Sequence, residues 1–484
     1  MKTETSLSPF ESLPPELHDE ILSHLATPLQ TPKQISTDHR WNDSRADTYA
    51  LVRRMTANES HGYESTLYAM RLVCRTLLRA ATRALCRRFA IVLPIFEDGV
   101  VDFISSLSSP SPSSSYFVDA VRGVCIPLSS REMYFPRRTL STEGDANGGL
   151  DRIRDFMVAF QGLLARKGVG ERVECLNVTL PYVWESDSSG GGHDGYDKVP
   201  VFDVNMLDGL RVYFADLLGM PGGVWANLTD LRLAMPAAVD CSVLGVVLGD
   251  EMLGRLRHLY LRYMDATGPG GSKAYLSCFD ENTDGDERVG MSNLQKEYPN
   301  RTYGPDLCKI VNRCPNLESL GLAGTQHIDC TLLDFKPRRG GGLRMLYLDR
   351  VKITFEKLIE LFSTDEGGVA SELRSLWMHD VELQTGTWGD VFQHLIKNCP
   401  ELSYFCPDSL VYDRNGESSD LKEYHYRAWE DIQPVFTADY RDVELVQELI
   451  NKVVKQAGGL DNYPDDHLES MWADDIDLND DEEE

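Results

Sequence analysis

Few residue patterns in this chain of 484 residues could carry out chemistry. Asp280, Asn282, Asp284 and Asp286 follow the spacing of the first half of an EF-hand calcium loop. The twelfth position of that loop would be Met291, where calcium binding needs a bidentate glutamate. The pattern therefore favours an acidic surface loop over a calcium site.

The glycine-rich segment Gly268–Lys273 could be taken for a phosphate-binding loop. That motif needs a lysine followed by Ser or Thr, whereas here Ser272 precedes Lys273. A strand before the segment and a helix after it are also not evident. We therefore expect a turn without a bound nucleotide.

The cysteines and histidines show no arrangement typical of a metal site or a nucleophile. The eleven cysteines contain no Cys-x-x-Cys pair, which predicts reduced thiols. Cys314 and Cys399 each precede a proline at an expected helix end and are predicted to be small buried residues. Neither a His-Glu-x-x-His motif nor a Gly-x-Ser-x-Gly motif occurs. We predict no catalytic residue, metal or cofactor, although a triad assembled from distant residues stays open.

Charge limits the classes of partner. The formal net charge is −28, whereas phosphate groups bind preferentially to Lys and Arg. Neither nucleic acid nor an anionic membrane is therefore expected as a partner. Residues 465–484 hold eleven acids without Lys or Arg. We expect 461–484 to be a solvated, disordered tail, and an acidic docking tail is the alternative.

The beginning of the sequence is polar and resembles no signal peptide. Apolar runs also stay below the roughly 18 residues that a membrane span needs. These features predict a cytoplasmic or nuclear protein, or one found in both compartments.

The strongest pattern is an internal repeat, L-x-x-L-x-L, which predicts a short strand with inward leucines in each copy. Its copies end at Leu233, Leu261, Leu322 and Leu348, with a variant at Met378, looser copies at Ile126 and Val178, and the start of a last copy at Leu402 and Phe405. Returning helices are expected at 306–313, 355–362 and 388–397. A single repeat cannot bury its own apolar face, so several copies must stack.

Segments outside the repeats are also predicted. Helices are expected at 13–25 and at about 67–89, and 105–115 and 142–149 read as loops. A terminal helix over 439–456 should close at Gly458. Its inward residues are expected to be Val443, Val446, Leu449, Ile450 and Val453.

Motifs at the beginning of the chain resemble the two halves of an F-box. The first half is carried by Leu13-Pro14 with Ile21-Leu22, and the second by the run Leu72-Val-Cys-Arg75. The segments 312–317 and 398–402 look like the Cys-Pro-x-Leu joint of F-box-type leucine-rich repeats. From residue 8 to about 410, the sequence resembles a fungal-type F-box protein with leucine-rich repeats.

The resemblance implies an α/β protein in which a helical F-box is followed by an irregular leucine-rich-repeat solenoid, or horseshoe. It implies an F-box at 8–93 with a polar insert at 26–66, repeats at 116–410, C-terminal capping helices at 411–460 and the acidic tail. The insert is longer than the link usual in the family. A plain pair of N-terminal helices that caps the repeats is therefore the alternative.

The resemblance also implies a function without catalysis. The F-box would bind the Skp adaptor, and through it a cullin, while the repeats hold an unknown protein substrate for ubiquitination. The implied adaptor-binding residues are Leu13, Pro14, Leu17, Ile21, Leu22, Leu25, Leu72 and Val73. The alternative is a leucine-rich-repeat scaffold with a degenerate F-box and no ligase role.

Aromatic residues alternate with the inward leucines of the repeats. Alternation along a strand places them on the opposite, concave face, where Tyr and Trp favour protein contacts. The candidate substrate contacts are Tyr260, Tyr263, Tyr347 and Trp377. Packing against the next repeat is the other interpretation of the same residues.

Overall fold

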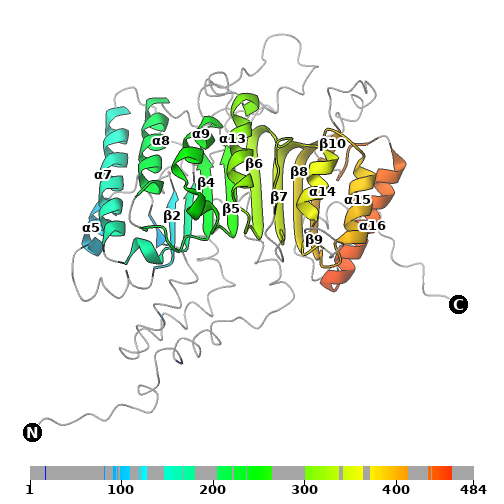
Figure 1. The fold of residues 1–484 in the computed structure, drawn as a ribbon, viewed down its shortest axis with the longest axis horizontal. Helices are drawn as coiled ribbons and strands as arrows, with labels where there is room; N and C mark the ends of the chain where they lie inside the picture. The colour runs from blue at the N-terminus through cyan, green and yellow to red at the C-terminus, as the bar shows by residue number, and fades with distance from the viewer. Residues whose placement is uncertain are drawn as a thin grey trace, which may run out of the picture. The chain divides into compact units, whose positions relative to one another are not determined.

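The computed structural model describes part of the chain. The described residues are 17, 81, 91–93, 95, 99–108, 118, 121–127, 146–166, 168–179, 204–220, 223–235, 237–263, 300–336, 342–363, 371–412, 434–437 and 439–459. They fall into two compact units, unit 1 up to residue 256 and unit 2 from residue 257 onward. In each unit parallel strands alternate with helices, so the protein is of the α/β class (Figure 1). Within this part of the chain, every helix is too short or too polar to cross a membrane.

Unit 1 is built on parallel strands in the spatial order β1-β2-β3-β4. The strands are β1 Ile91–Val92, β2 Gly123–Pro127, β3 Cys175–Thr179 and β4 Asp230–Met235. Its helices are α5 Val100–Ser108, α7 Ala146–Ala165, η3 Gly170–Arg172, α8 Val204–Leu218, α9 Val239–Val247 and α10 Asp250–Leu253. The looser repeat copies are confirmed as strands, because Val124 pairs with Leu176 and Leu176 with Leu231.

Two loops predicted in unit 1 are partly wrong. Helix α5 continues to Ser108, and the Ser106 and Ser108 hydroxyls donate to the Phe103 and Ile104 carbonyls of the same helix. Helix α7 begins at Ala146 despite a glycine pair, each of which costs about 1 kcal/mol relative to alanine. Three apolar residues farther along α7 are fully buried, and this packing outweighs the local preference. They are Ile153, Phe156 and Phe160.

Unit 2 continues the same alternation with longer strands. Its strands are β5 His258–Tyr263, β6 Ser319–Asp329, β7 Met345–Ile353, β8 Ser375–Leu383, β9 Tyr404–Asp408 and β10 Val411–Tyr412. Its helices are α13 Asn300–Asn312, α14 Phe355–Phe362, α15 Trp388–Asn398 and α16 Tyr440–Ala457. Strands β5 to β8 lie in chain order, and β9 and β10 both pair with β8.

The leucines of the repeat form two buried rows across unit 2, as predicted. Leu259, Leu320, Leu346, Leu376 and Phe405 pair in register, and each is at most 1% exposed. The second row, two residues farther along each strand, is Leu261, Leu322, Leu348 and Met378. Figure 1 shows α13, α14 and α15 in front of these strands. The expected helices are therefore confirmed, with α13 beginning six residues earlier than predicted.

A bulge interrupts three neighbouring strands at equivalent positions. Arg350, Asp380 and Ser409 have positive φ angles of 56°, 49° and 55°, in the left-handed region. One extra residue reverses the alternation of faces, so Val351 and Ile353 are buried although Leu346 and Leu348 are buried before the bulge. Strand β10 is the part of the last strand that follows the bulge at Ser409, which explains why it pairs with β8.

Helix α16 was predicted almost correctly. It ends at Ala457, and the following C-cap residue Gly458 has a φ of 94°, in the left-handed conformation. Its inward face consists of Val446, Leu449, Ile450 and Val453. Val443 was expected there but is 44% exposed, so that prediction is wrong. The first turn of α16 is held through the buried side chain of Asp442 instead.

Candidate functional site

The face of unit 2 opposite the leucine rows, which we call the second face, carries its aromatic and charged residues. In β7, Tyr347 lies between two inward leucines and Asp349 follows the second of them, and Trp377 and His379 occupy the same positions in β8. Because successive side chains of a strand point to opposite faces, these residues form rows across the strands.

The aromatic row consists of Tyr260, Tyr347, Trp377 and Tyr404. Its neighbouring ring centroids are 5.9, 5.8 and 6.3 Å apart, within the range of favourable aromatic contacts. Strand β6 contributes Gly321 to this row, and a Cβ there would lie 2.3 Å from Cδ2 of Tyr260. The absence of a side chain at Gly321 thus lets the Tyr260 ring lie across β6 and reach Tyr347.

Three of the four predicted substrate contacts therefore come together. Tyr347 is only 2% exposed and packs with Ala323, Tyr260 and Trp377, which agrees with the packing interpretation for this residue. Tyr260 and Trp377 are partly exposed. The backbone of Tyr263 pairs with Gly324, and its side chain lies outside the described residues.

A charged cluster lies beside the aromatic row, toward the carboxyl ends of the strands. We call it the bulge cluster: Asp349, Arg350, His379, Asp380 and Asp408. His379 Nδ1 lies 2.8 Å from Asp349 Oδ1, and His379 Nε2 lies 3.3 Å from Asp408 Oδ2. Arg350 approaches Asp349 at 3.6 Å and Asp380 at 3.7 Å. The bulges place two consecutive polar residues of β7 and two of β8 in the bulge cluster.

The bulge cluster shifts the proton affinities of its members. Burial alone would raise the pKa of Asp349, but Arg350, His379 and Arg262 outweigh it and lower the pKa to about 2. Burial would lower the pKa of His379, but the carboxylates of Asp349 and Asp408 outweigh it and raise the pKa to about 8. At neutral pH, His379 is therefore an imidazolium that links three strands.

This arrangement is unsuited to general-base catalysis. Both ring nitrogens of His379 are held by carboxylates, and the nearby Ser409 hydroxyl donates to Asp408 Oδ1 at 2.8 Å. A triad would need a histidine nitrogen free to accept the serine proton. Among the described residues, no group of three or more His, Cys, Asp or Glu side chains is placed to hold a metal ion.

Further ionisable side chains continue the network along the same strands. His327 Nε2 lies 3.5 Å from Asp380 Oδ1 and 3.9 Å from Glu382 Oε2. Lys352 Nζ lies 3.0 Å from Glu382 Oε1, and Glu382 is only 2% exposed. Opposite charges are thus compensated inside the network, as buried charges require.

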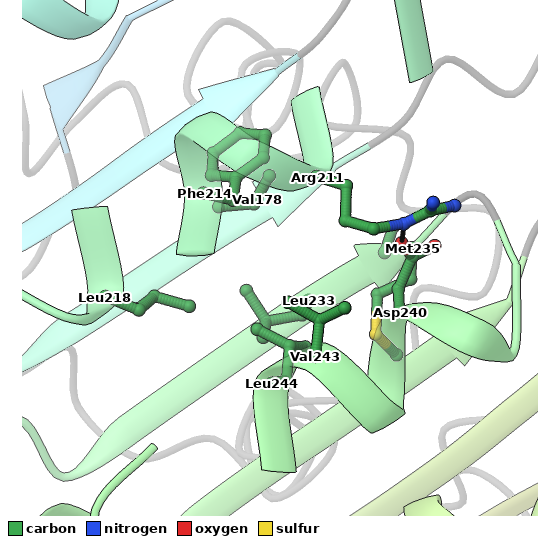
Figure 2. A pocket seen from close by; sticks show the side chains of 10 residues that line it. Val178, Arg211, Phe214, Leu218, Leu233, Met235, Asp240, Val243 and Leu244 are labelled. Atoms are coloured by element: carbon green, nitrogen blue, oxygen red, sulfur yellow. Dashed lines mark hydrogen bonds and ion pairs between the residues drawn. The ribbon is translucent and has the colours of Figure 1, made fainter. Parts of the chain in front are cut away.

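Unit 1 contains a small apolar cavity of about 40 Å³ between α8, α9 and strands β3 and β4 (Figure 2). Phe214, Leu233 and Leu244 contribute to its wall, and an ion pair between Arg211 and Asp240 closes one end. The Asp240 carboxylate also accepts from the Ala237 amide at 2.9 Å. The lining therefore offers apolar packing next to a carboxylate that is paired within the protein.

Most of the implied adaptor-binding residues lie outside the described residues. These are Leu13, Pro14, Ile21, Leu22, Leu25, Leu72 and Val73. Leu17 is described, and it is helical and 42% exposed. Cys314 and Cys399 are fully buried, as predicted, and burial raises their thiol pKa values to about 12 and about 11. Their thiols are therefore inert at neutral pH.

The bulge cluster was missed at the sequence level, although a signal exists. Asp349, His379 and Asp408 follow one another at intervals of 30 and 29 residues, which match the repeat. Asp349 and His379 each come two residues after a position of the aromatic row, and Asp408 comes two residues after Cys406, which pairs with Trp377. Aligning the copies beyond L-x-x-L-x-L would have placed these residues side by side.

Gly321 allows a direct test of how the packing of the aromatic row contributes to stability. Gly321→Val should lower the free energy of unfolding by about 1–3 kcal/mol, because the added side chain displaces the Tyr260 ring. The measurement is a denaturant titration followed by intrinsic tryptophan fluorescence, to which Trp377 and six other tryptophans contribute. Gly304→Ala is the control for a side chain added at an uncrowded glycine, since its Cβ meets nothing closer than 3.8 Å. It should not lower stability, because alanine is favoured over glycine inside helix α13. Equal stability of Gly321→Val and the unsubstituted protein would contradict this role.

Taken together, the described residues define an α/β protein with parallel strands and an aromatic and charged second face in unit 2. A comparison of the sequence with protein-family models finds no matching family. A comparison with curated proteins likewise finds no significant match.

Proposed function

We propose that this protein is the substrate-recognition subunit of a Skp–cullin–F-box ubiquitin ligase. The supporting observation is the order of the motifs in the sequence, with F-box-like halves first and leucine-rich repeats after them. In this role the N-terminal motif binds the Skp adaptor, the repeats hold the substrate, and the chain itself catalyses nothing. A cytoplasmic or nuclear location, or both, belongs to the same proposal.

The in-register rows of unit 2 support the repeat part of the proposal. Leu320, Leu346 and Leu376 pair directly across neighbouring strands, and each strand is followed by a helix or a connecting segment. A stack of such units forms a solenoid when each unit covers the apolar face of the next. A leucine-rich-repeat solenoid is the finer architecture that we propose, and the second face is its recognition surface.

Adaptor binding tests the proposal. The full chain should co-precipitate the Skp adaptor and a cullin, and Leu13→Ala with Pro14→Ala should abolish both. Val246→Ala with Leu332→Ala is the matched control, because it removes two apolar side chains that are 87% and 61% exposed. Failure of the unsubstituted chain to bind the adaptor would overturn the proposal.

The same experiment distinguishes the ligase proposal from the alternative, a leucine-rich-repeat scaffold with a degenerate F-box. The alternative is motivated by the polar insert at 26–66, which lies between the two F-box-like halves. Adaptor binding without cullin would favour this scaffold over a ligase.

A further inference from the structure

The amino ends of the unit 2 strands carry a row of exposed arginines. Arg257, Arg344 and Arg374 directly precede β5, β7 and β8, and all three are exposed. We call them the arginine edge. Glu318 lies between the first two, where its carboxylate contacts Arg257 and approaches Arg344 Nη1 at 3.4 Å. Arg344 Nε also lies 3.2 Å from Glu372 Oε2, so Arg257 and Arg344 are both paired with carboxylates.

The opposite end of the edge has cations in excess. The side chains of Arg374, Lys397 and Lys455 are all exposed. Within the described part of the chain, no carboxylate lies within ion-pair distance of any of the three. We call this set the unpaired cations. An exposed cation retains its attraction for an anion that arrives later, subject to screening by salt.

Helix α16 ends beside these cations. Lys452 Nζ donates to the Ile396 carbonyl at 2.7 Å, and Gln456 Nε2 donates to the Pro400 carbonyl at 2.8 Å. These contacts hold the ends of α15 and α16 together. Four residues after Pro400, the Tyr404 amide donates to the Arg374 carbonyl at 3.0 Å. The chain therefore leaves α16 next to the arginine edge.

We infer that the acidic C-terminal segment, residues 461–484, binds the arginine edge and the unpaired cations of its own chain. Eleven acids without Lys or Arg lie at 465–484, so the charges are complementary. From Gly459 the segment could span up to roughly 80 Å. The distance from β8 to β5 is about three strand spacings, or ~15 Å, so the segment is long enough.

Attachment makes this contact favourable even when each ion pair is weak. A covalently linked segment experiences an effective concentration in the millimolar range. The segment would then act as a built-in competitor that an external acidic peptide must displace. This inference does not depend on the proposed ligase role, because it concerns a different surface and needs no adaptor.

Peptide binding in trans tests the competition. The probe is a fluorescent peptide of residues 465–484, and the protein is the full chain with its eleven tail acids changed to Asn or Gln. The peptide should bind this variant by anisotropy at low ionic strength, and at least about tenfold more weakly to the unsubstituted chain. Binding should also weaken when salt rises to roughly 0.5 M.

Charge reversal locates the surface. Adding Arg374→Glu, Lys397→Glu and Lys455→Glu to the neutralised-tail variant should abolish peptide binding. The matched control carries Arg154→Glu, Lys309→Glu and Lys336→Glu, which change the net charge equally at exposed positions elsewhere. Absence of peptide binding to the neutralised-tail variant, or equal loss in the control, would overturn the inference.

Zero-length cross-linking tests the intramolecular contact in the unsubstituted full chain. A carbodiimide joins a carboxylate to a lysine amine only when the two are in contact. We expect cross-links from the 465–484 segment to Lys397 and Lys455, detected by mass spectrometry in the monomer, and few to Lys309 or Lys336. Equal cross-linking to all four lysines would contradict specific binding.

Discussion

Replacing Asp442 by alanine should lower the free energy of unfolding by about 3–5 kcal/mol, since each stranded buried donor costs about 1–3 kcal/mol. The Asp442 side chain is fully buried and accepts three hydrogen bonds. The donors are the Gly389 amide at 2.6 Å, the Tyr412 hydroxyl at 2.5 Å and the Thr437 hydroxyl at 2.7 Å. One carboxylate thus joins α16, the start of α15 and β10.

Chemical denaturation with fluorescence and far-UV circular dichroism would measure this loss. Hydrogen exchange should further show that the amides of α16 lose protection before those of β7. Asp390→Ala is the matched control, because Asp390 is in the same turn as Gly389 but half exposed and paired with Arg441 at 3.3 Å. Its removal should cost no more than about 1 kcal/mol. A loss below 1 kcal/mol for Asp442→Ala would show that these hydrogen bonds do not hold the helix.

Stability should depend on pH through His379. Its folded pKa is about 8, above the ordinary histidine value of 6.5, so its contribution is complete below pH 6.5 and is lost as pH rises through 8. A shift of this size corresponds to about 2 kcal/mol at most, and partial solvent exposure reduces it. Asp349 behaves oppositely, because its pKa is lowered to about 2, and its contribution is lost as pH falls from 3.8 toward 2.

The pH profile of the denaturation midpoint tests this expectation against His379→Gln. The unsubstituted protein should lose stability between pH 6.5 and 8.5, and the variant should lose less across the same interval. Other titrating groups affect both proteins alike, so the difference between the two curves isolates His379. Parallel curves would mean that the imidazolium does not link β7, β8 and β9.

The leucine pattern predicted the strands of unit 2 well because burial there is dictated by alternation. Leu259, Leu346 and Leu376 occupy equivalent positions, and no tertiary detail is needed to place them on the inner face. The glycine pair at the start of α7 misled the prediction for the opposite reason. Local preference favoured a loop there, and buried contacts farther along the helix overrode it.

The candidate site was only partly predictable. The aromatic row follows from alternation, but its continuity depends on Gly321, whose role appears only when the Tyr260 ring is in place. The bulge cluster depends on left-handed conformations at Arg350 and Asp380. An aspartate only weakly favours this conformation and an arginine does not, so the residue types did not predict the bulges. Side chains that are thirty residues apart meet only because the strands pair in register.

The last strand of unit 2 has a further consequence for the behaviour of the molecule at high concentration. An open strand edge can template the addition of another chain. Here Pro407 lacks an amide hydrogen, Ser409 interrupts the strand, and Leu410 exchanges hydrogen bonds with Pro434 and Phe436. The outermost strand therefore discourages polymerisation through strand addition, so this end of unit 2 is protected against aggregation by its own sequence.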